Sequence, residues 1–123
     1  METINSPYAH ITIEDNILFF TYHKIDDFDL NVAKRVVQDR LSLQREKAYP
    51  ILCDIRKLSI PSLEARRYLA LQGSILTKAV AYLTTTHGSN SLTQFFIRVD
   101  QPTIPAELFT MRHEALLYLK KYI

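Results

Sequence analysis

The chain has 123 residues, and its 15 basic and 13 acidic side chains leave a net charge of only +2. This near balance argues against a protein that is drawn to nucleic acid or to an anionic membrane by its overall field. The single cysteine, Cys53, excludes an internal disulfide framework and favours a reducing compartment. We therefore predict one domain over residues 1–123, with residues 1–7 as a loose N-terminal tail.

The sequence also argues against export and against a membrane span. Its opening residues, METINSPYAHITIEDN, contain no basic segment followed by an apolar one, as a signal peptide would. No apolar run approaches the roughly 20 residues that a transmembrane helix needs. We expect a cytoplasmic protein without membrane insertion.

The first predicted element is an antiparallel hairpin. Residues 8–14 alternate in polarity as a strand does, and residues 16–23 form a second strand pattern. Between the two patterns stand Asp15 and Asn16, which tolerate the left-handed backbone that a tight hairpin turn requires.

A helix follows the hairpin. Apolar residues recur at helical spacing over residues 30–41, and Asp27 or Asp29 can cap the first turn. Arg35 and Asp39 lie one turn apart, which indicates a solvated ion-pair surface rather than a basic stripe.

The next two elements are a buried strand and a second helix. After Pro50, residues 51–55 form the short continuous apolar run that is typical of buried parallel strands, with Cys53 in its middle. Ser62 then stands where a helix N-cap is expected, and Glu64 suits the first turn. The predicted buried stripe of this helix consists of Ala65, Tyr68, Leu69 and Leu76.

The remaining sequence predicts two helices and two strands. Residues 78–86 favour a central strand, and residues 87–99 carry helical spacing. Residues 106–109 favour a short edge strand, and Thr110 is expected to cap a last helix. The side chains of that helix that should point inward are Ala115, Leu116 and Leu119.

The predicted order is therefore β-β-α-β-α-β-α-(β)-α. Strands that alternate with helices imply right-handed crossovers and parallel pairing. We predict an α/β domain with a mixed sheet, in which the N-terminal hairpin is antiparallel, the βαβ centre is parallel, and helices pack on the sheet.

Four segments resemble a known family. They are ILCDIRKLSIPSLEARRYLA, AVAYLTTT, QFFIRVDQP and PAELFTMRHEALLYLKKY. Their order and spacing over residues 8–122 resemble the SpoIIAA-like branch of the STAS fold, the domain of anti-sigma-factor antagonists. The chain resembles more closely a group of small uncharacterised bacterial proteins with that fold. The resemblance implies a single SpoIIAA-like domain.

The resemblance does not imply the phosphorylation switch of the classical antagonists. In those proteins the strand ends in Asp, and the next helix opens on an Asp-Ser-Ser-Gly motif whose serine a kinase phosphorylates. Here Asp54 matches the strand aspartate, but residues 61–65 read PSLEA, without the glycine or the serine pair. We therefore interpret Ser62 as a structural N-cap and not as a phosphoacceptor.

No residue pattern indicates catalysis, a metal or a cofactor. The four histidines lack helical metal-pair spacing, and no serine stands in a Gly-x-Ser-x-Gly elbow. Two glycines, Gly73 and Gly88, are too few for a phosphate-binding loop. The aromatic residues follow core spacing instead of alternating with basic residues, so we expect no nucleic-acid partner.

One edge of the sheet is still expected to gather polar residues. In an open α/β sheet, ligands bind outside the carboxyl ends of the parallel strands, where residues 54–59 and 85–90 would meet. Free N–H groups of the helix that begins near Ser89 would favour an anion there. The candidate ligand-binding residues are Asp54, Arg56, Lys57, Ser59, Thr85, Thr86, His87, Ser89 and Asn90.

Two functions from different classes are compatible with these patterns. The first is a non-catalytic binding or regulatory module that docks an unidentified protein partner. The alternative is a small-molecule binding protein that holds an anionic or lipid-like ligand at the carboxyl edge of the sheet. The hairpin edge and the last helix also suggest a homodimer.

Overall fold

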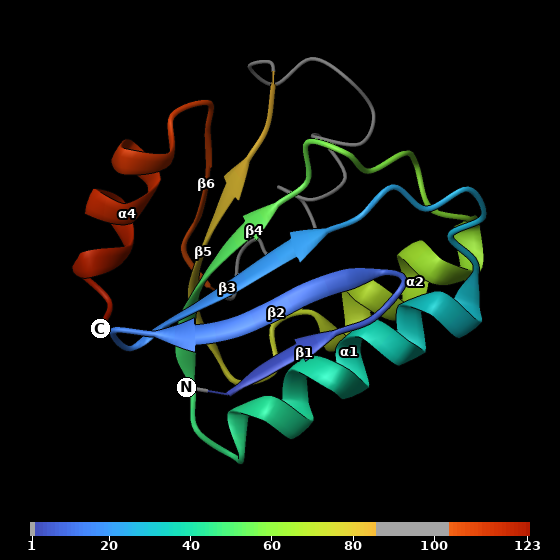
Figure 1. Cartoon of the computed structure of the whole chain (residues 1–123), viewed down its shortest axis with the longest axis horizontal. Coiled ribbons are helices and arrows are strands. Elements are labelled where there is room, and N and C mark those ends of the chain that lie inside the picture. Colours follow the sequence, from blue (N-terminus) through green and yellow to red (C-terminus); the bar gives the residue numbers. More distant parts are fainter. Residues whose placement is uncertain (1, 86–103) are drawn as a thin grey trace.

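The computed structural model describes residues 2–85 and 104–123. Within them, six strands form one sheet whose spatial order follows the order along the chain (Figure 1). The strands are β1 (Thr3–Asn5), β2 (Ala9–Glu14), β3 (Ile17–Tyr22), β4 (Tyr49–Asp54), β5 (Thr77–Leu83) and β6 (Ala106–Phe109). The helices of these residues are α1 (Leu30–Gln44), α2 (Leu63–Gln72) and α4 (Arg112–Lys120).

The pairing of the strands confirms the predicted mixed sheet. β1, β2 and β3 pair in antiparallel fashion, while β3, β4, β5 and β6 are parallel neighbours. The strands predicted over residues 51–55 and 78–86 therefore lie side by side in the same direction, as the βαβ interpretation requires. The helix predicted over residues 87–99 lies outside the described residues.

The predicted hairpin turn is confirmed. Glu14 pairs directly with Ile17, so the turn contains only Asp15 and Asn16. Their φ angles of 52° and 64° are in the left-handed region, which aspartate and asparagine adopt at a lower cost than most residues do.

The prediction of a loose tail over residues 1–7 was wrong, because Thr3–Asn5 form the strand β1. Ile4 pairs with Ile11 and packs against the core, and the hydroxyls of Thr3 and Thr12 lie 3.1 Å apart. Three residues are too few to show a periodic pattern, so the sequence carried no signal for this strand. β1 is ordered because it pairs with β2.

Two predicted positions at helix ends also need correction. Leu76, assigned to the buried stripe of α2, lies beyond its end at Gln72 and adopts a φ of 56° in the turn before β5. Thr110 does not cap α4, because it directly follows β6; Met111 occupies the N-cap position without a side-chain hydrogen bond.

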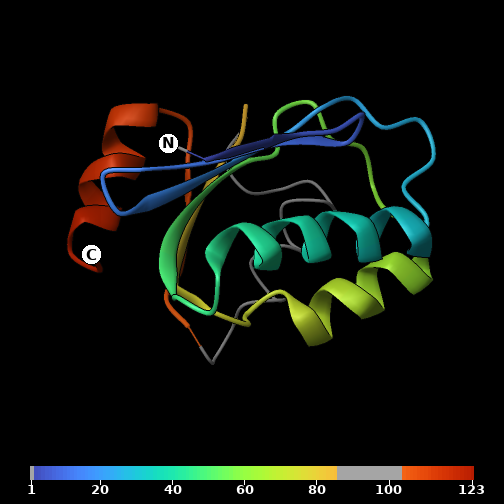
Figure 2. The same ribbon diagram turned by 60° about the horizontal axis from the view of Figure 1, so that its bottom comes forward.

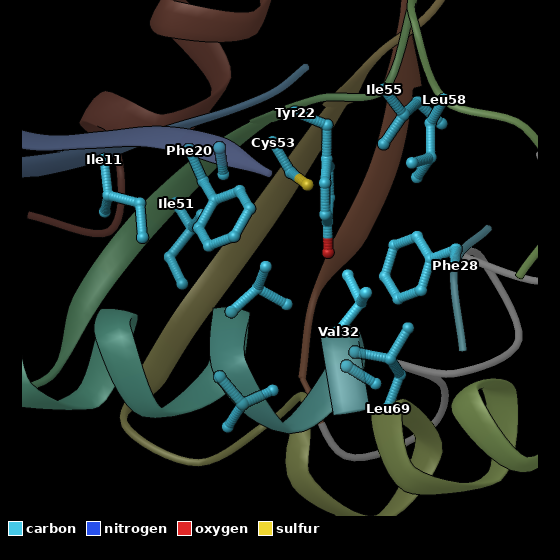
Figure 3. Close-up of a cluster of buried hydrophobic side chains, with 14 of the residues drawn as sticks. Ile11, Phe20, Tyr22, Phe28, Val32, Ile51, Cys53, Ile55, Leu58 and Leu69 are labelled. Atoms are coloured by element: carbon cyan, nitrogen blue, oxygen red, sulfur yellow. The ribbon is translucent and has the colours of Figure 1, made fainter. Parts of the chain in front are cut away.

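Helices cover both faces of the sheet. α1 and α2 lie side by side on one face (Figure 2), where aromatic side chains of β3 pack against Phe28 and α1. The ring centroids of Phe20 and Tyr22 lie 4.7 Å apart, and those of Tyr22 and Phe28 lie 5.8 Å apart (Figure 3). We call this the inner face of the sheet.

The opposite, outer face carries α4. Buried Ala115 and Leu119 of α4 pack with Ala79 and Ala81 of β5 and with Leu52 of β4, so the predicted inward positions 115 and 119 are confirmed. Leu116 is half-buried against the same cluster. In the part of the chain that the structure describes, no helix is both long enough and apolar enough to cross a membrane.

Candidate functional site

Three parallel strands end together at one edge of the sheet. The register places Thr21 of β3 beside Asp54 of β4, and Asp54 beside Leu83 of β5. The loop from β4 to α2 begins directly after Asp54, so the structure brings Asp54, Arg56 and Lys57 to this edge. We refer to these three residues as the edge cluster.

The other candidate residues are placed differently. Ser59 lies in the same loop, but its hydroxyl donates a hydrogen bond to the carbonyl of Ile25 at 3.3 Å and so fastens the loop. Thr85 follows β5 and is exposed. The four candidates that lie outside the described residues are Thr86, His87, Ser89 and Asn90.

Apolar anchors explain why the edge cluster faces solvent. Ile55 and Leu58 are buried and point from the loop into the core (Figure 3). The backbone N–H of Ile55 donates to the carbonyl of Leu83 at 3.0 Å, and that of Leu58 donates to the carbonyl of Ile55 at 3.2 Å. The turn between these anchors therefore leaves Arg56 and Lys57 exposed.

Asp54 holds Arg56 through three hydrogen bonds. Its Oδ1 accepts from the backbone N–H of Arg56 at 3.1 Å and from Nε at 3.0 Å, while Oδ2 accepts from Nη2 at 2.8 Å. The carboxylate side chain is only 11% exposed, whereas the arginine side chain is 50% exposed. This hydrogen bonding and the negative charge of Asp54 raise the pKa of the Arg56 guanidinium, so Arg56 stays charged.

A row of polar side chains runs across the outer face to this pair. Asn5 pairs with His10, His10 with Thr21, and Thr21 with Asp54, and directly paired residues point to the same face. The sequence interpretation missed His10 and Thr21. Strand alternation could have placed both on the polar face of the hairpin, but only the pairing register brings them into line with Asp54.

A surface hollow lies at this end of the row. It has a volume of about 340 Å³ and is lined by Thr21, Tyr22 and the edge cluster. The ring of Tyr22 points into the core toward Phe28 (Figure 3), so Thr21 and the edge cluster supply the hollow's polar side chains. A volume of this size is near the lower end of the range for small-molecule sites.

The inner face contains a much smaller cavity. It measures about 70 Å³ and lies between the sheet and the helices α1 and α2. Its lining is mainly apolar and includes Phe20, Cys53 and Leu69. Carriers of drug-sized apolar ligands have cavities of several hundred Å³, so this space is too small for such a ligand.

Ser62 has the N-cap geometry that the sequence predicts. Its backbone is extended, with φ −60° and ψ 164°, and its hydroxyl accepts a hydrogen bond from the N–H of Ala65 at 3.2 Å. Its own N–H donates to the carbonyl of Phe28 at 2.9 Å. Two large apolar side chains close to it in sequence, Ile60 and Leu63, are exposed.

No metal centre is evident in residues 2–85 and 104–123. These residues contain no group of three or more histidine, cysteine, aspartate or glutamate side chains that could hold an ion. Cys53 is buried within β4, as its position in the apolar run predicts.

One family model matches most of the chain. A model of the family described as Domain of unknown function (DUF7793) matches residues 11–123. The chain belongs to the DUF7793 family. No curated protein matches this DUF7793 chain.

A solved structure identifies the fold of this DUF7793 protein. The chain is similar to the crystal structure of an uncharacterized protein from the DUF3478 family, with a SpoIIAA-like fold, from Shewanella loihica PV-4. The TM-score is 0.67 at 21% sequence identity, and the match covers 97% of this chain and 99% of that chain. The predicted SpoIIAA-like fold is therefore confirmed.

Proposed function

We propose that this protein is a non-catalytic binding module that docks a protein partner at the edge of the sheet where β4 leads into α2. The observation that carries the proposal is the exposure of Ile60 (53%) and Leu63 (49%) in the segment that follows the charged edge cluster along the chain. Single exposed apolar residues are common, but a short segment that exposes two large apolar side chains and an arginine has the typical composition of an interface.

The surroundings of these side chains favour binding because they are fixed in advance. Ser59 ties the loop to Ile25, and the N–H of Ser62 ties the start of α2 to Phe28. A surface that is already ordered loses less conformational entropy when a partner binds. A SpoIIAA-like fold is also compatible with a regulatory or binding role, by analogy at the level of fold.

The contacts of Asp54 favour binding over catalysis. Within residues 2–85 and 104–123, its carboxylate accepts hydrogen bonds from the backbone and the guanidinium of Arg56 and from no histidine, unlike the acid of a catalytic triad. The absence of enzymatic activity stays a prediction, which turnover in a broad hydrolase screen would contradict.

The second candidate function is the binding of a small anionic molecule, and the hollow of about 340 Å³ favours it. A charged, polar lining suits an anion better than a lipid. The apolar cavity under the sheet, at about 70 Å³, adds no room for an acyl chain.

Affinity capture with two charge substitutions tests docking. Leu63→Glu places a charge in the proposed surface, and Leu117→Glu on α4 is the matched control, because Leu117 is 60% exposed. We expect proteins captured from the native cells by the wild type to be retained by Leu117→Glu and lost with Leu63→Glu. Equal recovery by both variants, with unchanged circular dichroism, would contradict the proposed surface.

Self-association through β1 or α4 stays a separate prediction. β1 is one edge strand of the described sheet, and α4 exposes Leu117 to solvent. Light scattering that shows only monomer at high protein concentration would remove the homodimer.

A further inference from the structure

We propose that Asp54 holds Arg56 as a preorganised receptor for one anionic group, a carboxylate or a phosphate, that enters the hollow between Thr21 and Lys57. This inference deepens the proposed function, because it rests on the same surface and names the chemistry by which a partner is recognised. The anionic group is either a side chain of the partner or a free small anion.

Arg56 has more N–H donors than Asp54 accepts from. A guanidinium carries five N–H groups in a planar fork. Asp54 accepts from Nε and from Nη2, which lie along one side of the fork. The N–H groups of Nη1 and the second N–H of Nη2 point away from Asp54. Two parallel N–H groups of this kind match the oxygens of a carboxylate or a phosphate.

The hydrogen bonds with Asp54 also fix the orientation of Arg56. An exposed arginine normally samples many rotamers and must be ordered when a ligand binds. Here the carboxylate of Asp54, which is only 11% exposed, accepts hydrogen bonds from both the backbone and the side chain of Arg56. The remaining donors are therefore oriented before an anion arrives.

The side chains around the hollow carry a net positive charge. Lys57 lines it together with Arg56, while Thr21 lies beside Asp54 and adds a hydroxyl. Two cationic side chains against one carboxylate in the lining of the hollow favour a negative ligand.

NMR titration with inorganic phosphate, and separately with acetate, tests the site directly. We expect saturable shifts of the Arg56 Nε–H signal and of the Thr21 amide. Arg56→Gln should weaken phosphate binding at least about fivefold, because the charge and the fork are both lost. Arg35→Gln is the matched control, because Arg35 also pairs with a carboxylate, Asp39, and is 51% exposed, yet should leave the affinity unchanged.

The substitution Asp54→Asn separates orientation from charge. If only the sum of charges mattered, removing a carboxylate would tighten phosphate binding. If Asp54 positions Arg56, the Asp54→Asn variant should instead bind phosphate several-fold more weakly. ¹⁵N relaxation should also show faster motion of the Arg56 Nε–H in this variant. Unchanged or tighter binding by a folded Asp54→Asn variant would overturn the inference.

A second variant covers the case in which Asp54→Asn fails to fold. Arg56→Lys keeps the charge but cannot form the fork, so it should also weaken phosphate binding several-fold. Wild-type affinity in Arg56→Lys would contradict a guanidinium receptor.

The same variants separate this inference from the docking proposal. If Leu63→Glu loses the partner but phosphate and acetate leave the Arg56 signal unmoved, docking stands and the receptor is refuted. If phosphate binds at Arg56 and Leu63→Glu still recovers every protein that the wild type recovers, the receptor stands as a site for a free anion and the docking surface is refuted. Loss of the captured partner in Arg56→Gln but not in Arg35→Gln assigns the anionic group to the partner.

Discussion

The hydroxyl of Ser62 accepts a hydrogen bond from the N–H of Ala65 in the first turn of α2. This bond satisfies a backbone donor that would otherwise lack a partner within the helix. Ser62 therefore has a complete structural role as the N-cap of α2.

Substitutions at Ser62 distinguish a cap from a phosphoacceptor. Ser62→Ala should lower the free energy of unfolding by about 1 kcal/mol, because the N–H of Ala65 loses its acceptor. Ser62→Asp should be neutral or stabilising, because aspartate caps well and its charge faces the positive end of the helix. Thermal unfolding measures both, with exposed Ser42→Ala of α1 as the control. Should Ser62→Ala leave the melting curve unchanged while Ser62→Asp alone abolishes partner binding, the cap interpretation is wrong.

Arg40 is a buried charge with a structural role. Its Nη1 donates to Oε1 of Gln44 at 2.6 Å and to the carbonyl of Ile75 at 2.9 Å, and its Nη2 donates to the carbonyl of Gln72 at 3.4 Å. The guanidinium thus joins α1 to the end of α2, where the last carbonyl groups of a helix lack a donor within the helix.

Replacement of Arg40 should therefore be costly. Arg40→Met removes a charged donor from buried carbonyls, and we expect a loss of about 2 kcal/mol in the free energy of unfolding. Chemical denaturation measures this loss, and Arg35→Met on the exposed face of α1 should change stability by less than about 1 kcal/mol. Similar effects of both substitutions would contradict the assigned role of Arg40.

Tyr118 predicts a pH dependence in the alkaline range. Burial, a hydrogen bond with Tyr122 and the nearby charge of Glu107 raise the pKa of its phenol. The fold therefore favours the protonated form, and this contribution is fully present below the unfolded pKa of about 10 and is lost as the pH rises through the higher folded value. Tyr118→Phe should lose less stability than the wild type between about pH 9 and pH 11. Parallel stability curves from urea unfolding would refute this.

At the scale of elements, the hairpin turn places two non-glycine residues in the left-handed region. Asn16→Gly should raise stability by up to about 1 kcal/mol, because glycine adopts a positive φ without a steric cost and Asp-Gly suits this turn. Asn16→Val should lower it by about 1–2 kcal/mol. Thermal unfolding tests both, and equal stability of the two variants would argue against the observed turn.

Periodicity succeeded for the long elements. Residues 9–14, 17–22 and 30–44 were predicted nearly at their observed bounds, because each has one buried face with a regular spacing. β1 was missed because three residues show no period, and the end of α2 was placed too late because Leu76 happens to continue the helical spacing. The cap assigned to Thr110 failed because α4 starts only after the extended Met111.

At the scale of the whole molecule, alternating strands and helices were enough to predict the parallel centre and the SpoIIAA-like fold. They also placed Asp54, Arg56 and Lys57 at the carboxyl edge of the sheet. The hydrogen bonds between Asp54 and Arg56 could not be predicted, because they depend on the loop conformation. The pairing of His10 with Thr21 could not be predicted either, because it depends on the strand register. Such features follow from tertiary packing rather than from local sequence.

Docking requires that the surface at the carboxyl edge of the sheet, where β4 leads into α2, meets a partner. A photo-crosslinking amino acid placed at Ile60 in the native cells tests this most directly, with the same group at Leu117 of α4 as the control for exposure. We predict a discrete adduct with a different protein from position 60, lost on Arg56→Gln, and from position 117 no adduct other than one with a second copy of this chain. An adduct with a different protein from position 117 alone, or equal adducts with it from both positions, would contradict the docking proposal.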